Sequence, residues 1–270
     1  MSGPRVTFEL VPPIVVAVVS LALAAGADRP VRPPRAVHPT PELLLDGVRT
    51  RVRWTDGDTF RVLEGPHRGR STRLAGVNAL ETHGPVHRWG AWAPPELWAI
   101  ALESAAIAAS AASECTVGRP DRYGRLLVDC PQAAAELVRR GHAMVFAVEG
   151  AADPALLALQ QAAQAAGAGM WAKGVPRALV TSVHSTAEPG LSRGAYDRVV
   201  DTRTGLARAH PHHRAYPVCE WVCAGTPEDG SCMLYVPFER RYRHRPPCLR
   251  ASAPTEGAEG PAGPTSDAAP

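Results

Sequence analysis

The sequence has few aromatic residues, almost no lysine and little net charge. Phe, Trp and Tyr make up 6% of its 270 residues, and Lys173 is the single lysine, so arginine supplies nearly all of the positive charge. The 29 basic and 26 acidic residues give a formal charge of +3, which is too balanced for an acidic or basic tail protein. A charge this small does not by itself predict a nucleic-acid partner. Individual arginines must therefore be judged by their context.

The sequence also lacks an uninterrupted apolar run of the ~20 residues that span a bilayer. A shorter apolar stretch at 14–27 follows Arg5 and ends in Ala25-Gly26-Ala27, an A-x-A cleavage pattern. This pattern predicts a signal peptide over residues 1–27 and a secreted or periplasmic protein. The alternative is an uncleaved N-terminal anchor, and membrane contact is expected only in that case.

Glycine and proline are abundant, with 24 and 27 residues, and they help to divide the chain. Residues 28–40 are predicted to form a Pro-rich spacer, and residues 251–270 a disordered tail, because neither segment can build a core. Between them we expect a globular domain at 41–174 and a Cys-containing C-terminal module at 175–250. The module shows no clear periodicity.

Strand and helix patterns are segregated along residues 41–174. Alternating apolar residues predict three antiparallel strands within 47–77, with a turn at Asp56-Gly57. The expected helices are an Ala-rich helix at 94–110, a short helix at 133–140, and a third that begins at Asp153-Pro154. This order indicates an α+β fold with a small, strongly bent sheet.

The six cysteines, an even number, suit an exported protein with disulfides. Cys115 and Cys130 flank an expected hairpin and are predicted to pair, with two buried free thiols as the alternative. Two further disulfides are expected in the C-terminal module, where three pairings are possible, and a zinc site aided by histidines is the alternative. The residues concerned are Cys219, Cys223, Cys232 and Cys248, with His210, His212, His213 and His244.

Five short motifs occur in order between about residues 47 and 172. They are Asp56-Gly57-Asp58-Thr59, Arg73-Leu74-Ala75-Gly76-Val77-Asn78-Ala79-Leu80-Glu81-Thr82, Asp121-Arg122-Tyr123-Gly124-Arg125-Leu126, Leu137-Val138-Arg139-Arg140-Gly141-His142-Ala143 and Gly169-Met170-Trp171. In order and spacing they resemble the staphylococcal nuclease (thermonuclease) family. The resemblance implies a five-stranded OB-fold β-barrel with three helices, a fold that binds oligonucleotides. It also implies a metal-dependent endonuclease that cleaves DNA and RNA with low sequence specificity and leaves 3′-phosphates.

The residue types in these motifs suit phosphodiester hydrolysis. Attack on a phosphodiester adds negative charge at the phosphoryl oxygens, so the site needs cationic donors and a carboxylate that orients or deprotonates water. By motif position, the resemblance assigns the catalytic roles to Arg73, Glu81 and Arg125. Tyr123 and Phe146 are the candidate substrate-contacting aromatic residues, and stacking is expected to be weak because few aromatics follow Gly141.

The metal site departs from the family pattern. The resemblance implies that Ca²⁺ is held by Asp58, by the side chain of Asn78 and by the backbone carbonyl of Ala79. Asp56 is expected to contact these ligands rather than the ion itself. Asn78 stands where the family has an aspartate, so one negative charge is missing and weaker Ca²⁺ binding is expected. Leu80 replaces the usual proline before the glutamate. These departures motivate the alternative that the domain is a weakened or inactive module that binds nucleic acid or protein.

The C-terminal module has one further motif. The segment from Phe238 to Arg245 contains four arginines together with aromatic residues and could bind a nucleic-acid backbone. A solvated arginine-rich face is the alternative. A third hypothesis is that residues 175–250 bind a component of the cell envelope. The expected partners are single-stranded or frayed DNA and RNA, and no stable protein partner is predicted.

Overall fold

The computed structural model describes residues 38–250. The expected signal peptide, most of the spacer and the tail at 251–270 lie outside these residues. Within the described part of the chain, no helix combines the length and the apolar character needed to cross a membrane.

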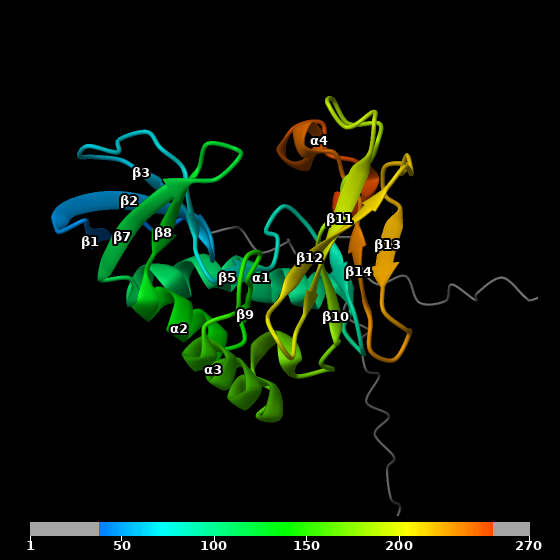
Figure 1. Cartoon of the computed structure of the whole chain (residues 1–270), viewed down its shortest axis with the longest axis horizontal. Coiled ribbons are helices and arrows are strands. Elements are labelled where there is room, and N and C mark those ends of the chain that lie inside the picture. The colour runs from blue at the N-terminus through cyan, green and yellow to red at the C-terminus, as the bar shows by residue number, and fades with distance from the viewer. Residues whose placement is uncertain (1–37, 251–270) are drawn as a thin grey trace, which may run out of the picture. The chain divides into compact units, whose positions relative to one another are not determined.

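The first half of the described chain builds a nearly closed six-stranded sheet (Figure 1). Its strands, in spatial order, are β3 (Thr59–Val62), β2 (Val48–Asp56), β1 (Glu42–Leu45), β7 (Glu114–Pro120), β8 (Leu126–Asp129) and β4 (Thr72–Leu74). The pairs β1–β7 and β4–β8 are parallel, and the other pairs are antiparallel. The sheet thus has six strands where five were expected.

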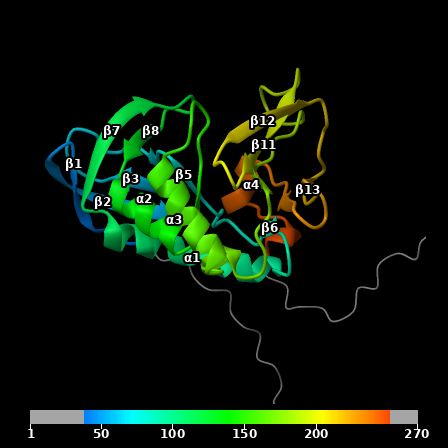
Figure 2. The same ribbon diagram turned by 60° about the horizontal axis from the view of Figure 1, so that its bottom comes forward.

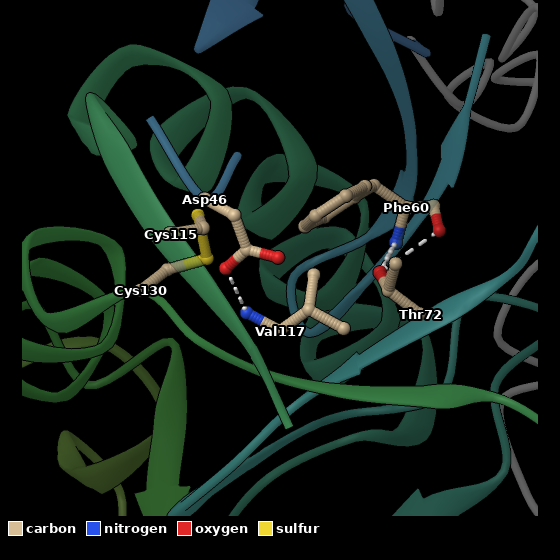
Figure 3. The surroundings of a disulfide bond; sticks show 6 residues. All are labelled: Asp46, Phe60, Thr72, Cys115, Val117 and Cys130. Atoms are coloured by element: carbon tan, nitrogen blue, oxygen red, sulfur yellow. Dashed lines mark hydrogen bonds between the residues drawn. A yellow bond between two sulfur atoms is a disulfide. The ribbon is translucent and has the colours of Figure 1, made fainter. Parts of the chain in front are cut away.

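A contact between the two outer strands nearly closes the sheet. Thr72 of β4 donates its hydroxyl to the Phe60 carbonyl of β3 at 2.9 Å and accepts the Phe60 N–H at 3.2 Å (Figure 3). A bridge between Arg61 and Ser71 lies beside it. Inside, alternate residues of β2 and β3 are buried, including Trp54 and Phe60, whose ring centroids are 4.9 Å apart. The period-2 alternation of the sequence therefore builds the core of this sheet.

Three α-helices precede residue 175, and their first residues explain where they start. They are α1 (Pro94–Ala111), α2 (Pro131–Arg139) and α3 (Pro154–Ala165). Each begins with proline, which has no N–H to leave unsatisfied in the first turn. The Asp153 carboxylate also caps α3 by accepting the N–H groups of Ala155 and Leu156. Neighbouring helices pack together, α1 on α2 and α2 on α3 (Figures 1 and 2).

Two of the motifs meet where the chain leaves α3. The short 3₁₀ turn η1 (Gly169–Trp171) follows the helix, and the Met170 N–H donates to the Gly141 carbonyl at 2.9 Å. A Cβ at Gly141 would lie 2.1 Å from the Ala168 carbonyl oxygen, and one at Gly169 would lie 2.4 Å from the Gly141 carbonyl oxygen. Both positions require glycine because the two backbones touch.

Residues 175–250 contain strands that the sequence did not indicate. One sheet holds β10 (Ala178–Ser182), β11 (Ala195–Asp201) and β12 (Ala207–His212). A second holds β13 (Trp221–Ala224), β14 (Ser231–Leu234) and, from the first half of the chain, β6 (His87–Arg88). The remaining elements are the pair β5 (Val77–Ala79) and β9 (Ala143–Val145), helix α4 (Phe238–Tyr242) and the turn η2 (Pro247–Leu249). The shared sheet joins the C-terminal segment directly to the loop that follows Glu81.

All six cysteines form disulfides, and none is free in residues 38–250. Cys115 pairs with Cys130 across the β7–β8 hairpin, as predicted, beside the Asp46 carboxylate that accepts the Val117 N–H (Figure 3). The C-terminal pairs are Cys219–Cys248 and Cys223–Cys232, which leaves no thiolate for the zinc alternative. Three disulfides are typical of proteins in an oxidising compartment.

Candidate nuclease site

A compact polar cluster forms where the β2–β3 turn meets β4 and β5. The Leu74 N–H donates to the Asp58 carbonyl at 2.8 Å, which holds the turn against β4. The Ala79 N–H of β5 donates to Asp58 Oδ2 at 2.6 Å. The expected metal-ligand residues Asp58, Asn78 and Ala79 are therefore brought together, and the side chains of the first two are buried.

Arg73 lies within this cluster. Its Nη1 forms an ion pair with Asp58 Oδ1, and its Nη2 donates to Asn78 Oδ1 at 2.6 Å. The Asn78 amide in turn donates to the Ala79 carbonyl oxygen at 2.9 Å. The side-chain oxygens of Asp58 and Asn78 and the Ala79 carbonyl all accept bonds from the protein. The guanidinium supplies positive charge at the position where Ca²⁺ was expected.

The donor chemistry still fits Ca²⁺. A carboxylate, an amide oxygen and a backbone carbonyl are ligands that this ion accepts. To use them, the ion would have to displace Arg73 and the Asn78 amide from these oxygens. Within residues 38–250, no group of three or more His, Cys, Asp or Glu side chains is arranged to hold a metal ion.

Asp56 adds a second carboxylate to the cluster. Its Oδ1 accepts the Asp58 N–H at 3.2 Å. Burial and the neighbouring Asp58 carboxylate raise the pKa of Asp56 well above its ordinary value, although Arg73 opposes the shift and Glu81 adds to it. The charges of both Arg73 and Glu81 therefore affect the pKa of Asp56.

Glu81 is surrounded by nitrogen groups that the sequence did not point to. Its Oε2 lies 3.0 Å from His83 Nδ1 and 4.0 Å from Arg241 Nη1. Its N–H donates to His87 Nε2 at 3.3 Å. Burial alone would raise the pKa of the Glu81 carboxyl, but the hydrogen bond and charge of His83, followed by the charge of Arg241, lower it below its usual range. The side chain is 34% exposed, so water weakens these effects without removing them.

The third expected catalytic residue, Arg125, immediately precedes the neighbouring strand β8. In the parallel β4–β8 pair, Thr72 lies opposite Leu126 and Arg73 opposite Leu127. Thr72 and Leu126 are buried, so Arg73 and Arg125 project from the opposite face of the sheet. Arg125 is held by Asp121, with Nε and Nη2 each 2.8 Å from Oδ2. It makes no direct contact with Glu81.

The two expected aromatic residues differ in their surroundings. Tyr123 is 61% exposed at the tip of the β7–β8 hairpin, where its ring lies 5.6 Å from the Arg125 guanidinium and its hydroxyl 3.2 Å from that of Tyr196. Phe146 is half-buried after β9, and no interaction within the described residues joins its side chain to the rest of the candidate site. Only Tyr123 is linked to the expected catalytic residues.

The sequence did not point to His83 or His87, and it indicated Arg241 and Tyr242 only as part of an arginine-rich segment, without predicting that they lie near Glu81. His83 and His87 follow Glu81 closely, so their proximity to it in sequence was the one available signal. Arg241 and Tyr242 are about 160 positions downstream, and only the folded C-terminal segment brings them to Glu81. A cavity of about 570 Å³ is lined by residues such as Arg177, Asp201 and Arg208, and its lining does not include Arg73, Glu81 or Arg125.

The comparisons with known proteins agree with the motifs. Residues 71–173 match the model of a family described as staphylococcal nuclease homologue. No curated protein matches the chain. The chain therefore contains a staphylococcal nuclease-like domain. Members of the matched family are typically nucleases. The match includes Arg73, Glu81 and Arg125, whereas Asp56 and Asp58 precede it and residues 175–250 follow it.

Proposed function

We propose that the staphylococcal nuclease-like domain hydrolyses phosphodiester bonds of DNA and RNA with low sequence specificity. In this proposal the catalytic domain spans residues 41–174, and residues 175–250 are an accessory module. The protein works in an oxidising space, secreted or periplasmic. The observation that supports the proposal is the family match over residues 71–173, which includes Arg73, Glu81 and Arg125, together with the contact of Arg73 with the buried Asp58 carboxylate.

The protein groups divide the chemistry between charge stabilisation and water orientation. Arg73 and Arg125 present planar guanidinium donors to the phosphoryl oxygens, on which negative charge accumulates during attack. Glu81 accepts a hydrogen bond from the attacking water and orients it. Its lowered pKa keeps the carboxyl ionised at neutral pH, and it also makes Glu81 a weaker base. Orientation of water is thus its main contribution.

Calcium is proposed as the cofactor. Asp58, Asn78 and the Ala79 carbonyl would hold it, and bound Ca²⁺ would supply Lewis-acid stabilisation of the phosphate charge. The close contacts of Arg73 with Asp58 and Asn78 imply competition between the guanidinium and the ion. We therefore propose that this site binds calcium more weakly than an all-carboxylate site would.

The experiment is digestion of single-stranded DNA and RNA by the purified protein, with and without a calcium chelator. Cleavage that the chelator abolishes supports the whole proposal. Cleavage that persists in chelator supports the proposed nuclease activity but excludes calcium as its cofactor. Arg73→Ala serves as the control against a contaminating nuclease, because it should lose the activity.

A second candidate function is nucleic-acid binding without hydrolysis. Asn78 and the engagement of Arg73 favour it, since both leave the expected metal position with less negative charge and an internal cation. Binding of single-stranded DNA without cleavage at every calcium concentration would establish this alternative.

A further inference from the structure

We infer that the segment from Phe238 to Arg245 forms a binding surface for single-stranded nucleic acid that continues from Glu81. The inference rests on the proposed function and deepens it, because it names the part of the accessory module that holds the substrate strand. In the nuclease-like domain, Trp98 lies close to Glu81, with its Nε1 donating to the Thr82 carbonyl at 2.8 Å, but this side chain is buried. The C-terminal segment supplies both aromatic and arginine side chains there.

The segment is firmly attached to the loop around Glu81. Arg245 Nη2 donates to the His83 carbonyl at 2.6 Å and to the Leu249 carbonyl at 3.0 Å. A Cβ at Gly84 would lie 2.7 Å from Leu249 Cδ2, so the Leu249 side chain packs directly against the Gly84 backbone. The Cys219–Cys248 disulfide fixes the end of the segment to the rest of the module. The position of α4 beside Glu81 is therefore built into the fold.

Arg241 faces the candidate catalytic carboxylate. Its Nε donates to the Val236 carbonyl at 3.1 Å, and its Nη1 lies 4.0 Å from Glu81 Oε2. The side chain is only 17% exposed. A guanidinium held in this way is preorganised to bind a phosphate next to Glu81.

The aromatic residues of α4 are exposed. Phe238 and Tyr242 are 71% and 62% exposed, and no residue of the helix is buried. Their ring centroids are 6.4 Å apart, and the Tyr242 ring lies 6.2 Å from that of His83. Both large rings of the helix are therefore exposed to solvent, and Tyr242 also lies beside the candidate site. Such rings are stacking platforms for unpaired bases, which accept any sequence.

The positive charge of the segment favours an anionic partner. Four arginines and one acidic residue, Glu239, occupy positions 238–245. Alternating arginines and aromatic rings bind phosphates and bases of a flexible strand together, whereas the stacked bases of a duplex are not available to the rings. Single-stranded nucleic acid is therefore the occupant that this surface fits.

The test measures binding of a fluorescent oligothymidylate of about 12 nucleotides to the full-length protein by anisotropy, in chelator and at several salt concentrations. The variants are Phe238→Leu with Tyr242→Leu, which keeps apolar bulk without an aromatic face, and Arg241→Gln. Tyr242→Phe retains stacking, and Arg193→Gln, an exposed arginine outside the candidate site, is the charge-matched control.

We expect the double leucine variant to bind at least about tenfold more weakly, which corresponds to the loss of one base–aromatic stack. Arg241→Gln should lower the slope of log affinity against log salt by about 0.7, the value for one phosphate contact on a single strand. Tyr242→Phe and Arg193→Gln should bind like the wild type. Circular dichroism should show the same fold for all variants, since the exchanged rings are exposed.

Hydrolysis of a small chromogenic phosphodiester separates this inference from the proposed function. The wild type should cleave this substrate if the proposed function holds, whereas binding of the oligonucleotide by the double leucine variant tests the inference. Unchanged oligonucleotide binding would overturn the inference, even if the wild type is an active nuclease. Weakened binding supports it, even if the wild type cleaves nothing. A double leucine variant that loses binding to anionic lipid vesicles but not to the oligonucleotide would assign the surface to lipid and also overturn the inference.

Discussion

Replacing Asn78 with aspartate probes the part of the site in which a metal ion and Arg73 compete. Asn78 is buried on β5, where its Oδ1 accepts from Arg73 Nη2 and its Nδ2 donates to the Ala79 carbonyl oxygen. Asn78→Asp keeps the first interaction and gives it a charge. It abolishes the second interaction, because a carboxylate has no N–H to donate.

The size of the effect without metal follows from these contacts. Loss of the bond to Ala79 costs about 1 kcal/mol. The new carboxylate attracts Arg73 but repels Asp58, and each term is about 3–4 kcal/mol at an effective dielectric constant of 20, so the two largely cancel. Burial of the added charge gives a further penalty of about 1 kcal/mol or more. We expect a net destabilisation of about 2 kcal/mol, or a Tm about 4–8 °C lower in chelator for a chain of this size.

Calcium should reverse this loss in the variant. The restored carboxylate raises the affinity for Ca²⁺, and a ligand at 100 times its Kd stabilises the folded state by about 2.7 kcal/mol. Ten millimolar calcium should thus raise the Tm of Asn78→Asp by several degrees more than that of the wild type. The calcium concentration for half-maximal DNA cleavage should fall, while the rate at saturating calcium changes less.

The assay is thermal unfolding followed by circular dichroism in chelator, in calcium and in magnesium, together with calcium titrations of cleavage. Asn78→Ala is the matched control, because it removes both hydrogen bonds without adding charge. Equal calcium shifts in the wild type and in Asn78→Asp would remove Asn78 from the metal site. An unchanged Tm of Asn78→Asp in chelator would refute the hydrogen-bond argument itself.

Three further predictions concern catalysis, the hairpin and acid stability. Arg125→Ala should lower kcat by about 10³-fold in a single-stranded DNA assay, because one preorganised charge donor is lost, and a loss below tenfold would exclude that role. Replacing Cys115 and Cys130 together by alanine should lower the free energy of unfolding in urea by about 3 kcal/mol, as expected for a sequence separation of 15, and an unchanged midpoint would contradict this. Burial lowers the pKa of His87 to about 4, so the unfolded chain binds a proton more readily and stability falls as the pH drops from about 6.5 to 4. His87→Gln should reduce that fall by about 3 kcal/mol in urea titrations at the two pH values, and an equal fall in both proteins would refute it.

The local signals of the sequence determined much of the first half of the molecule. Proline at the start of α1 and α3 and glycine in the tight turns are effects of single residues on their own backbone, so they can be read without the fold. The alternation in β2 and β3 predicted their buried faces. The order of the five motifs identified the nuclease-like domain, and the positions of Cys115 and Cys130 around a hairpin predicted their pairing.

Other features depend on contacts between segments far apart in the sequence. Strand β1 was missed although Asp46-Gly47, with both residues at positive φ, joins it to β2 in a two-residue hairpin. Only its parallel pairing with β7 depends on a distant segment. In the C-terminal module, four cysteines allowed three pairings, and only the antiparallel register of β13 and β14 places Cys223 opposite Cys232. The strands of that module lacked a clear period because polar residues and Pro211 interrupt them.

The candidate site divides in the same way. The sequence alone determined which residue types are available for phosphodiester chemistry, because Arg73, Glu81 and Arg125 belong to recognisable motifs. The tertiary structure decided their partners: Arg73 contacts Asp58 and Asn78, and Arg241 reaches Glu81 from about 160 positions away. Charges act through space rather than along the chain, so the electrostatic environment of Glu81 exists only once the C-terminal segment has folded beside it.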